Sequence, residues 1–426
     1  MNLLYITTNV PWPLNSGGNQ AFYMMADYIR HCHQLSLLFK VRNSEEKKAV
    51  EVLKRKWDNV TFYVLDESSE VYRKSDRLLE SLSWYDSLMY RMFDFISHSV
   101  QRKMRRKIRK IDFVKSNSTL YEDLDGINHV FCDYVYEISR KGFDAIQIEF
   151  YENLPFVYLL PRGVKKIFVH HEIRFVRNEI ELSLFKKQSA AEKMLLEQHK
   201  AREIAALDAY DTIITLTEKD KEKLAQYIPQ DKIYVSPAIT NAAEMKNLPF
   251  KPTNGLAFVG SCAHFPNADA IIWYIEKVLP VLRQKCKNIP CLNIIGNWNQ
   301  KMIKGMDINE QEVKLTGFVP DLQKYLNGKI SIVPIRIGSG MRMKILDSVA
   351  AGSPIVTTSV GCEGLPMINE KNCLIADTAE DFADAIIRMI QDKEMQQIFA
   401  QAAQNIEKGM LDNEVLQQKR CAVYDF

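Results

Sequence analysis

Short apolar runs alternate with longer segments of mixed polar and apolar residues along almost the whole chain. In the longer segments the apolar residues recur every three to four positions, as on one face of a helix. This alternation is typical of βαβ units, in which helices connect parallel strands. The predicted strands are Leu3–Thr7, Leu35–Phe39, Thr61–Leu65, Ala145–Glu149, Lys166–His170, Thr212–Leu216, Gly255–Gly260, Leu292–Ile295, Val313–Thr316, Lys329–Val333, Pro354–Thr358 and Cys373–Ala376.

One break interrupts the pattern. Between Ser236 and Gly255 the chain has three prolines, few large apolar residues and no period. We therefore expect an α/β protein with two doubly wound, Rossmann-like domains facing a central cleft, where the carboxyl ends of strands bind ligands. The expected divisions are an N-terminal domain at 1–240, a linker at 241–254, a C-terminal domain at 255–410, and a tail or helix at 411–426. Return of this last segment to the N-terminal domain is one alternative.

The composition fits two such domains. A chain of 426 residues with 46% hydrophobic residues is long enough for two cores. Its 56 basic and 53 acidic residues leave a net charge of +3, which does not indicate a nucleic-acid partner. The 8 cysteines form no C-x-x-C pair and indicate reduced thiols. No apolar run is long enough to span a bilayer, so we expect a cytoplasmic protein.

A helical and aromatic insertion at about 66–127 departs from the strand rhythm. It contains a basic run, Gln101–Lys110, with Met104 and Ile108 four positions apart, as in an amphipathic helix. A solvated face is the slightly favoured interpretation. The alternative is contact with anionic lipid at the inner face of the cytoplasmic membrane, or with a lipid-linked acceptor.

The segment 333–364 combines a strand, a glycine turn, a helix, a glycine stop and a second strand. Backbone N–H groups at a helix start, together with the helix dipole, favour an anion, most naturally a phosphate. An ordinary turn at Gly338–Gly340 is the alternative. However, Arg342 and Lys344 lie close to the helix start, where cations are unfavourable unless an anion compensates them.

Lys344 and Asp347 are three positions apart and therefore share one face of this helix. An ordinary surface ion pair, worth little, is the alternative interpretation. The remaining helix positions are apolar, which predicts packing against the sheet with only the helix start exposed. A cation for phosphates and a carboxylate for hydroxyl groups together indicate a nucleotide-sugar site.

These residues resemble the GT-B glycosyltransferases, and most closely glycosyltransferase family 4. Members commonly read G-S-G-x-R-x-K-x-L-E-A-x-A-x-G-x-P-V-V-x-T-x-x-G-x-E-G at this place. The residues here are Gly338, Ser339, Gly340, Arg342, Lys344, Leu346, Asp347, Ala350, Gly352, Pro354, Val356, Gly361, Glu363 and Gly364. Further matches are Phe258–Ser261, Pro266–Ala270, Gly317–Asp321, His171–Arg177, and Pro13 with Gly17 and Gly18.

The resemblance implies that the C-terminal domain binds a nucleoside diphosphate sugar and the N-terminal domain binds the acceptor. In the family, two glutamates separated by seven residues hold the donor sugar and the ribose. Here the ribose position is Asp347 and the sugar position is Ser339. Gly260 and Ser261 are not followed by the Arg and Lys of many members, so we infer that Arg342 or Lys344 supplies the countercharge.

The resemblance also implies roles for individual residues. His171 ends a strand where the family often places a histidine that touches the donor sugar, although a structural histidine is the alternative. The predicted catalytic residues are thus His171, Lys344 and Asp347. The predicted donor-binding residues are Gly260, Ser261, Phe318, Gly338, Ser339, Gly340, Met341 and Arg342.

Gly17 and Gly18 form the predicted diphosphate or acceptor loop, because they follow the first strand and precede a helix beginning near Asn19. Asp123–Asp125 mimics a metal-binding D-x-D. The resemblance nevertheless implies no cofactor and no obligatory metal.

The sequence therefore predicts a retaining glycosyltransferase that moves a sugar from a nucleoside diphosphate sugar to a hydroxyl of a saccharide or lipid-linked acceptor, in glycan or polysaccharide assembly. A nucleotide-sugar epimerase of the same fold and a catalytically degenerate GT-B scaffold are the alternatives. The prediction requires the helix start near Gly340 to face the gap between the domains, unobstructed by protein side chains.

Overall fold

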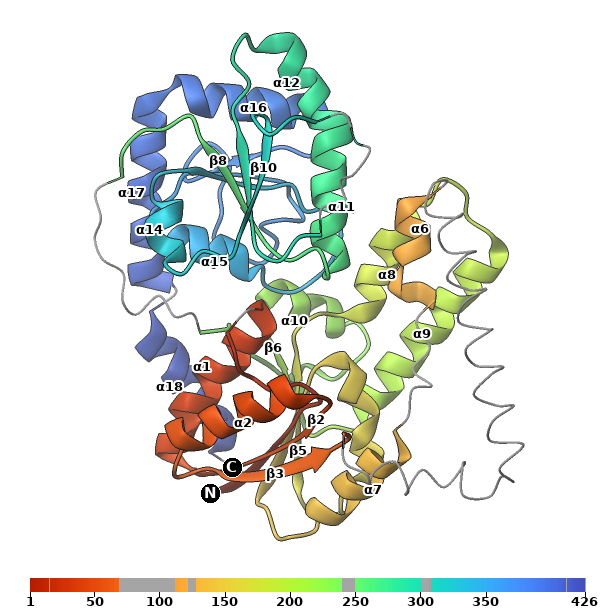
Figure 1. Ribbon diagram of the computed structural model, residues 1–426. Helices are drawn as coiled ribbons and strands as arrows, with labels where there is room; N and C mark the ends of the chain where they lie inside the picture. The colour runs from red at the N-terminus through yellow and green to blue at the C-terminus, as the bar shows by residue number, and fades with distance from the viewer. Residues whose placement is uncertain are drawn as a thin grey trace.

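The computed structural model describes residues 1–14, 16–68, 112–121, 128–239, 250–299, 306, 308–410 and 412–425. These residues form two α/β domains, each built around one parallel sheet (Figure 1). The basic run 101–110, the D-x-D at 123–125 and most of the expected linker lie outside the described residues.

Seven parallel strands form the N-terminal sheet. They are β1 (Asn2–Ile6), β2 (Gln34–Val41), β3 (Thr61–Asp66), β4 (Ala145–Glu149), β5 (Lys165–His170), β6 (Thr212–Thr215) and β7 (Ile233–Val235). Their order is β3-β2-β1-β4-β5-β6-β7. The order reverses between β1 and β4, so the loops that follow these strands diverge there and leave room for a ligand.

Helices cover both faces of this sheet. They are α1 (Gly17–Cys32), α2 (Ser44–Lys56), α6 (Phe113–Asn117), α7 (His129–Ile138), α8 (Arg174–Ser183), α9 (Ala190–Asp208) and α10 (Glu218–Leu224), with 3-10 turns η1 (Thr119–Tyr121), η2 (Tyr151–Leu159) and η3 (Gln230–Lys232). Side chains set the helix starts: Thr217 caps α10, and Ser189 and Glu192 form a capping box at α9.

The C-terminal sheet has six parallel strands in the order β10-β9-β8-β11-β12-β13. The strands are β8 (Leu256–Val259), β9 (Leu292–Ile295), β10 (Val313–Gly317), β11 (Ile330–Val333), β12 (Ile355–Thr357) and β13 (Leu374–Ile375). Its helices are α11 (Phe265–Trp273), the π-helical turn η5 (Tyr274–Val278), α12 (Leu279–Lys285), α14 (Leu322–Leu326), α15 (Met343–Ala350), α16 (Ala379–Gln391) and α17 (Lys393–Met410). The expected pair of doubly wound domains is confirmed.

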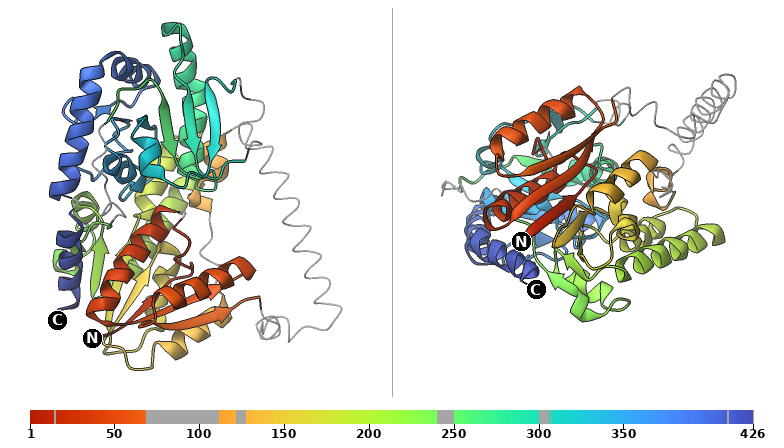
Figure 2. Two further views of the ribbon diagram at one scale, coloured as in Figure 1. Left: turned by 60° about the vertical axis from the view of Figure 1, so that its left-hand side comes forward. Right: turned by 90° about the horizontal axis from the view of Figure 1, so that it is seen from below.

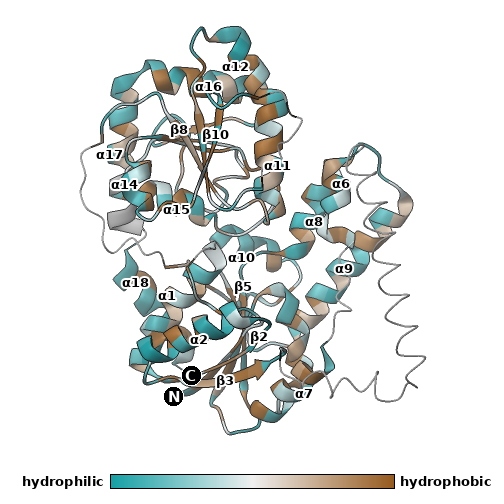
Figure 3. Ribbon diagram, viewed as in Figure 1, coloured by the Kyte–Doolittle hydropathy of each residue, from teal (hydrophilic) through white to brown (hydrophobic). Residues whose placement is uncertain are grey.

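Strand side chains alternate between the two faces of each sheet. In β1, Leu3 and Tyr5 join one apolar cluster, whereas Leu4 and Ile6 join another on the opposite face. Figure 3 shows the hydrophobic residues concentrated on the central strands of both domains. Burying each such aliphatic side chain stabilises the fold by about 1.5–3 kcal/mol.

The end of the chain packs against the N-terminal domain. Helix α18 (Asn413–Cys421) contacts α1, and the turn η6 (Ala422–Tyr424) places Tyr424 in the core, fully buried. The chain termini therefore lie close together (Figure 1; Figure 2). Among the described residues, no helix has both the length and the apolar character needed to cross a bilayer.

Candidate functional site at the domain interface

The loop between β11 and α15 faces the N-terminal domain. The Ser339 hydroxyl donates to the carbonyl oxygen of Ile173 at 3.0 Å, and the Ser339 amide makes a long 3.4 Å contact with Glu172 Oε1. Both partners lie in the loop between β5 and α8. The helix start of α15 thus lies where the carboxyl ends of the two sheets meet, at the expected place.

Gly340 allows the two domains to approach this closely. Its φ is +75°, in the left-handed region, and a Cβ at this position would lie 2.1 Å from the carbonyl oxygen of His171. Gly17 has a similar position across the interface, because its Cβ would lie 2.7 Å from Cγ of Met343. Glycine is required at Gly340 for both conformational and steric reasons.

Protein side chains occupy the helix start, so the expectation of an unobstructed anion site is wrong for this structure. Arg342 is the N-cap residue of α15, and its Nη1 donates to the carbonyl oxygens of Ser339 and, at 3.0 Å, Gly340. The Glu172 carboxylate lies beside the Ser339 amide. An internal carboxylate therefore lies where an external anion was expected.

Glu172 is held in this position by basic neighbours. Arg177 Nη1 donates to Glu172 Oε2 at 2.9 Å. Burial raises the pKa of Glu172, but Arg177 and Arg174 lower it more strongly, and its pKa is about 2. His264, at the start of α11, and Arg342 also contribute to this lowering. The surroundings of Glu172 are thus strongly favourable to negative charge.

Lys344 is directed into the C-terminal domain. Its Nζ donates to Oδ1 of Asn267 and lies 4.9 Å from the centre of the Phe258 ring. Burial, with a further contribution from Arg342, lowers the pKa of Lys344 to about 7, and Asp347 opposes the change. Burial likewise raises the pKa of Asp347 to about 7, against the influence of Lys344. The contact with Asn267 differs from the surface ion pair that was the alternative expectation.

Asn267 connects Lys344 to the loop after β8. Its Nδ2 donates to the Ser261 carbonyl oxygen at 2.9 Å, and a Cβ at Gly260 would lie 2.5 Å from the same nitrogen. The structure thus brings the predicted residues Gly260, Ser261 and Lys344 together. Asn267 was not predicted as a site residue, although it lies in the P-N-x-D-A match.

His171 lies on the opposite side of the interface, after β5. Its Nε2 lies 2.6 Å from Glu149 Oε2, and its ring stacks on Phe150 with 4.4 Å between ring centres. A Cβ at Gly18 would lie 3.1 Å from Cε1 of Phe150, so Gly17 and Gly18, which form the start of α1 and not a loop before it, pack close to this ring. By contrast, His170 bonds Glu203 at 2.9 Å in the buried interior.

Two predicted residues have other surroundings. Phe318 is 83% exposed after the edge strand β10. Met341 packs against the apolar cores of both domains. Met341 therefore contributes to the contact between the domains, and Phe318 stays a predicted donor-binding residue.

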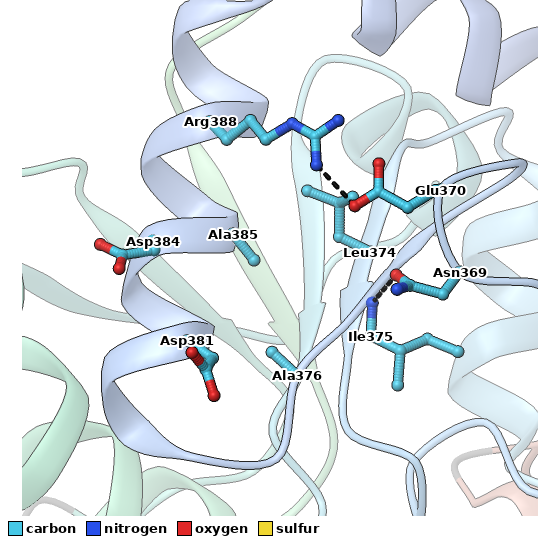
Figure 4. Close-up of a pocket in the computed structure, with 9 residues that line it drawn as sticks. All are labelled: Asn369, Glu370, Leu374, Ile375, Ala376, Asp381, Asp384, Ala385 and Arg388. Carbon is cyan, nitrogen blue, oxygen red and sulfur yellow. Dashed lines mark hydrogen bonds and ion pairs between the residues drawn. The ribbon is translucent and has the colours of Figure 1, made fainter.

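A pocket of about 220 Å³ lies elsewhere, between β13 and α16. Figure 4 shows Arg388 reaching from α16 to Glu370, where the ion pair measures 2.6 Å. None of the predicted site residues lines it. Within the described ranges, no three His, Cys, Asp or Glu side chains are grouped as a metal site. Independence from metal stays a prediction.

The site also contains residues that were not predicted. Glu149 ends β4, whose sequence Ala-Ile-Gln-Ile-Glu is buried and mainly apolar, and a carboxylate at the end of a buried strand was the signal available in the sequence. Glu172 lies within the H-E-I match. Nothing in the sequence indicated that Glu172 would contact the C-terminal domain.

Comparison with known proteins gives matches over the C-terminal domain and over most of the chain. Residues 253–392 match a family model described as Glycosyl transferases group 1. A protein from Klebsiella pneumoniae, described as an uncharacterized 44.6 kDa protein in the cps region, is 23% identical over 398 residues, covering 90% of each chain.

Several solved structures have the same two-domain arrangement. S. aureus TarM, solved with UDP and alpha-GlcNAc-glycerol, covers 100% of both chains with a TM-score of 0.64 and 12% identity. Anabaena HepE, solved with UDP and glucose, covers 100% of both chains with a TM-score of 0.63 and 10% identity. Sucrose-phosphate synthase from Thermosynechococcus elongatus covers 100% of this chain and 98% of its own, with a TM-score of 0.63 and 11% identity.

Proposed function

We propose that this chain, which has the GT-B fold and a Glycosyl transferases group 1 domain at residues 253–392, transfers a sugar from a nucleoside diphosphate sugar to an acceptor hydroxyl. The observation that supports this most directly is the position of α15. Its glycine-rich start lies at the domain interface with Arg342 and Lys344 beside it, and Asp347 follows on the same helix.

Catalysis on this proposal depends on stabilising the diphosphate as it leaves. The amides of Gly338–Gly340, the dipole of α15 and the Lys344 ammonium group supply positive potential in a site shielded from water. Asp347, once ionised, accepts hydrogen bonds from the ribose hydroxyls. His171 contacts the donor sugar from the N-terminal domain.

Donor binding on this proposal requires Glu172 to move. A diphosphate oxygen and the Glu172 carboxylate cannot share the Ser339 amide. Rotation of the Glu172 side chain or separation of the domains would release that amide, as domain opening does in many transferases. The basic groups around Glu172 would then face the incoming phosphates.

The finer assignments extend the same proposal. UDP is the nucleotide named for TarM and HepE, so UDP sugars are the first donors to test. The relative from a cps region supports a role in polysaccharide assembly with a saccharide or lipid-linked acceptor. Retention of anomeric configuration, independence from metal and a location at the cytoplasmic side of the membrane complete the proposal. The anomeric configuration of the product, read by NMR, tests retention.

A catalytically inactive GT-B scaffold is the second candidate. The observation that favours it is the occupation of the helix start by Glu172 and Arg342. Binding of a nucleoside diphosphate without release of sugar across a panel of acceptors would support this candidate over the transferase.

The first experiment measures thermal shift with nucleoside diphosphates and then calorimetry with the best ligand. A ligand that binds the folded chain raises its Tm. Lys344→Ala should weaken donor binding at least tenfold, because about 1.4 kcal/mol of charge-assisted contact is lost. Lys324→Ala, at an exposed lysine on α14, is the control. Unchanged donor affinity in Lys344→Ala would contradict the proposed site.

A further inference from the structure

A chain of hydrogen bonds connects the C-terminal turn η6 to His171. Tyr5 Oη lies 2.5 Å from Tyr424 Oη, Tyr424 bonds Gln147 Oε1 at 2.6 Å, and Gln147 Nε2 bonds Glu149 Oε1 at 2.6 Å. Glu149 Oε2 then lies 2.6 Å from His171 Nε2. The first four side chains are at most 3% exposed. Five residues from four separate segments are thus linked inside the N-terminal domain.

The chemistry of these groups fixes the direction of each bond. An ionised carboxylate only accepts, so Gln147 Nε2 and His171 Nε2 both donate to Glu149. A carboxyl group is a stronger acid than imidazolium in water, so the shared proton belongs on the ring nitrogen. Gln147 Oε1 is left as the acceptor for the Tyr424 hydroxyl. Because the Tyr424 proton is used there, Tyr5 donates to Tyr424.

The Glu149 carboxylate, unlike that of Glu203, does not cap a helix. Glu203, the partner of His170, also accepts from the amides of Arg174 and Phe175 and so caps α8. In the part of the chain that the structure describes, the Glu149 carboxylate has only Gln147 and His171 as hydrogen-bond partners. Glu203 therefore stabilises a helix start, whereas the Glu149 carboxylate bonds only two side chains.

The residue after Glu149 holds the same ring from another side. Phe150 stacks on His171 at an interplanar angle of 15°. Its φ is +69°, a conformation that is unfavourable for an aromatic residue and occurs mainly where the surroundings enforce it. Consecutive residues at the end of β4 thus fix both the hydrogen bond and the plane of the His171 ring.

We propose that Glu149 is a positioning residue that holds His171 in the Nε2–H tautomer, and that the C-terminal turn supports it through Tyr424 and Gln147. The proposal rests on the proposed function, in which His171 contacts the donor sugar. With Nε2–H committed to Glu149, the Nδ1 lone pair is the ring's remaining acceptor. It takes a hydrogen bond from a hydroxyl group of the bound sugar.

The tautomer is measured by ¹⁵N NMR of the full chain labelled at its 8 histidines, with His171→Gln to assign the signal. Wild type should show His171 with the proton on Nε2 in its neutral form. Glu149→Gln should give a mixture of tautomers. A proton on Nδ1 in wild type, or an unchanged tautomer in Glu149→Gln, would overturn the proposal.

Tyr424→Phe tests the part of the hydrogen-bond chain that is farthest from His171, because it removes one hydroxyl and keeps the ring. Tyr210→Phe is the matched control: Tyr210 is equally buried, and its hydroxyl bonds the Leu154 carbonyl oxygen at 2.7 Å, away from His171. We expect the His171 signal to change in Tyr424→Phe and to stay unchanged in Tyr210→Phe. If Glu149→Gln does not fold, Tyr424→Phe carries the test, and an unchanged His171 signal there contradicts the proposal.

Kinetics provide the second readout. Glu149→Gln should lower kcat for sugar transfer about 10- to 100-fold, the usual loss when a partner that orients a site residue is removed. Tyr424→Phe should lower it about fivefold, and Tyr210→Phe should leave it unchanged. Absence of any transfer by wild type would refute the proposed function alone, because the tautomer spectrum still tests Glu149.

Discussion

Glu172 has the negative charge that a helix start of this kind attracts. The carboxylate lies within reach of Ser339 in the C-terminal domain and bonds Arg177 in its own. Its pKa of about 2 means that it is ionised at neutral pH. This residue therefore stabilises the interface and, on the proposed function, competes with the donor diphosphate.

Replacing Glu172 separates these two effects. Glu172→Gln removes one of the two carboxylates that pair with Arg177, the other being Glu181, and removes the negative charge near Arg342, so the ligand-free variant should melt below wild type. Adding nucleoside diphosphate should then raise its Tm by more than it raises the Tm of wild type, because the competing charge is gone. Differential scanning fluorimetry measures both. Glu152→Gln, at an exposed carboxylate that pairs with Arg174 at 3.1 Å, is the control. An equal rise in Tm for wild type and Glu172→Gln would rule out competition.

The pKa of Lys344 predicts how binding of the donor depends on pH. Its pKa of about 7 lies below the ordinary value because burial disfavours the ammonium form. Below pH 7 Lys344 is already protonated in the free protein, so its positive charge is available to a phosphate. Above pH 7 the Lys344 contact must also take up a proton, which lowers affinity by at most about tenfold per pH unit. The pKa of Asp347 is also about 7, and its ionisation favours the ribose contact, so Asp347→Asn is the variant in which this fall should be seen alone. The phosphate's own charge is nearly constant there, because its second pKa is about 6.

Calorimetry at several values between pH 7 and 8.5, in buffers of different ionisation enthalpy, measures this proton uptake. Lys344→Ala should bind weakly and with no such dependence. Affinity of Asp347→Asn that is constant over this range would show that Lys344 stays charged in the free protein, or does not contact the phosphates.

At the scale of the elements, the sequence was most informative about strands. Both β4 and β9 have the predicted bounds, because each is a short and mainly apolar run between polar turns. The short strand β7 was missed, since Ile233–Val235 lies between prolines and is too brief to show a period. The helical pattern of Phe185–Ala209 predicts one long helix, but α9 begins only at Ala190, where the Ser189 capping box outweighs the apolar residues before it. A glycine commonly ends a helix, which predicts an end at Gly409, but this residue lies inside α17.

The elements of the site were predictable only in part. The glycine turn, α15 and the end of β5 were identified from local pattern and from the family resemblance. The contacts of Glu149 with His171 and of Glu172 with Ser339 depend on which strands are neighbours and on how closely the domains approach. Local sequence does not contain that information, since each pair is joined only by the tertiary fold.

Gly340 provides a test of how closely the two domains approach each other. Gly340→Ala would place a Cβ 2.1 Å from the backbone of His171, so the domains should no longer close fully. Gly142→Ala is the matched control, because Gly142 has a φ of +86° and nothing within 4 Å of a Cβ. Both variants should lose about 1–2 kcal/mol through backbone strain. Only Gly340→Ala should increase the radius of gyration in small-angle X-ray scattering. An unchanged radius would show that the domains close in another way.

Several contacts hold the whole molecule in its closed arrangement. Glu363 pairs with Lys219 at 3.0 Å and Lys223 at 2.9 Å across the interface. Elsewhere in the interface, Phe113 of α6 packs against Phe265 of α11 with 5.8 Å between ring centres. Domain opening therefore involves breaking polar and aromatic contacts together.

The C-terminal segment contributes to the stability of the distant domain. Removing residues 412–426 exposes the sites of Leu416, Val423 and Tyr424, which are buried in the N-terminal domain. We expect a loss of about 5 kcal/mol from the N-terminal domain, while the C-terminal domain keeps its stability. Scanning calorimetry should then show two transitions. Val415→Ala, at a 58% exposed position on α18, should shift Tm little. A single unchanged transition in the shortened chain would contradict this assignment.

The path of α18 and η6 has a consequence for biosynthesis. Residues of β1 leave the ribosome before those of every other element described, yet Tyr5 bonds the buried hydroxyl of Tyr424, which lies 419 positions later in the chain. The first domain therefore completes its core after the second has been translated. A nascent chain stalled before α18 should be more sensitive to proteases in its first half than the released protein.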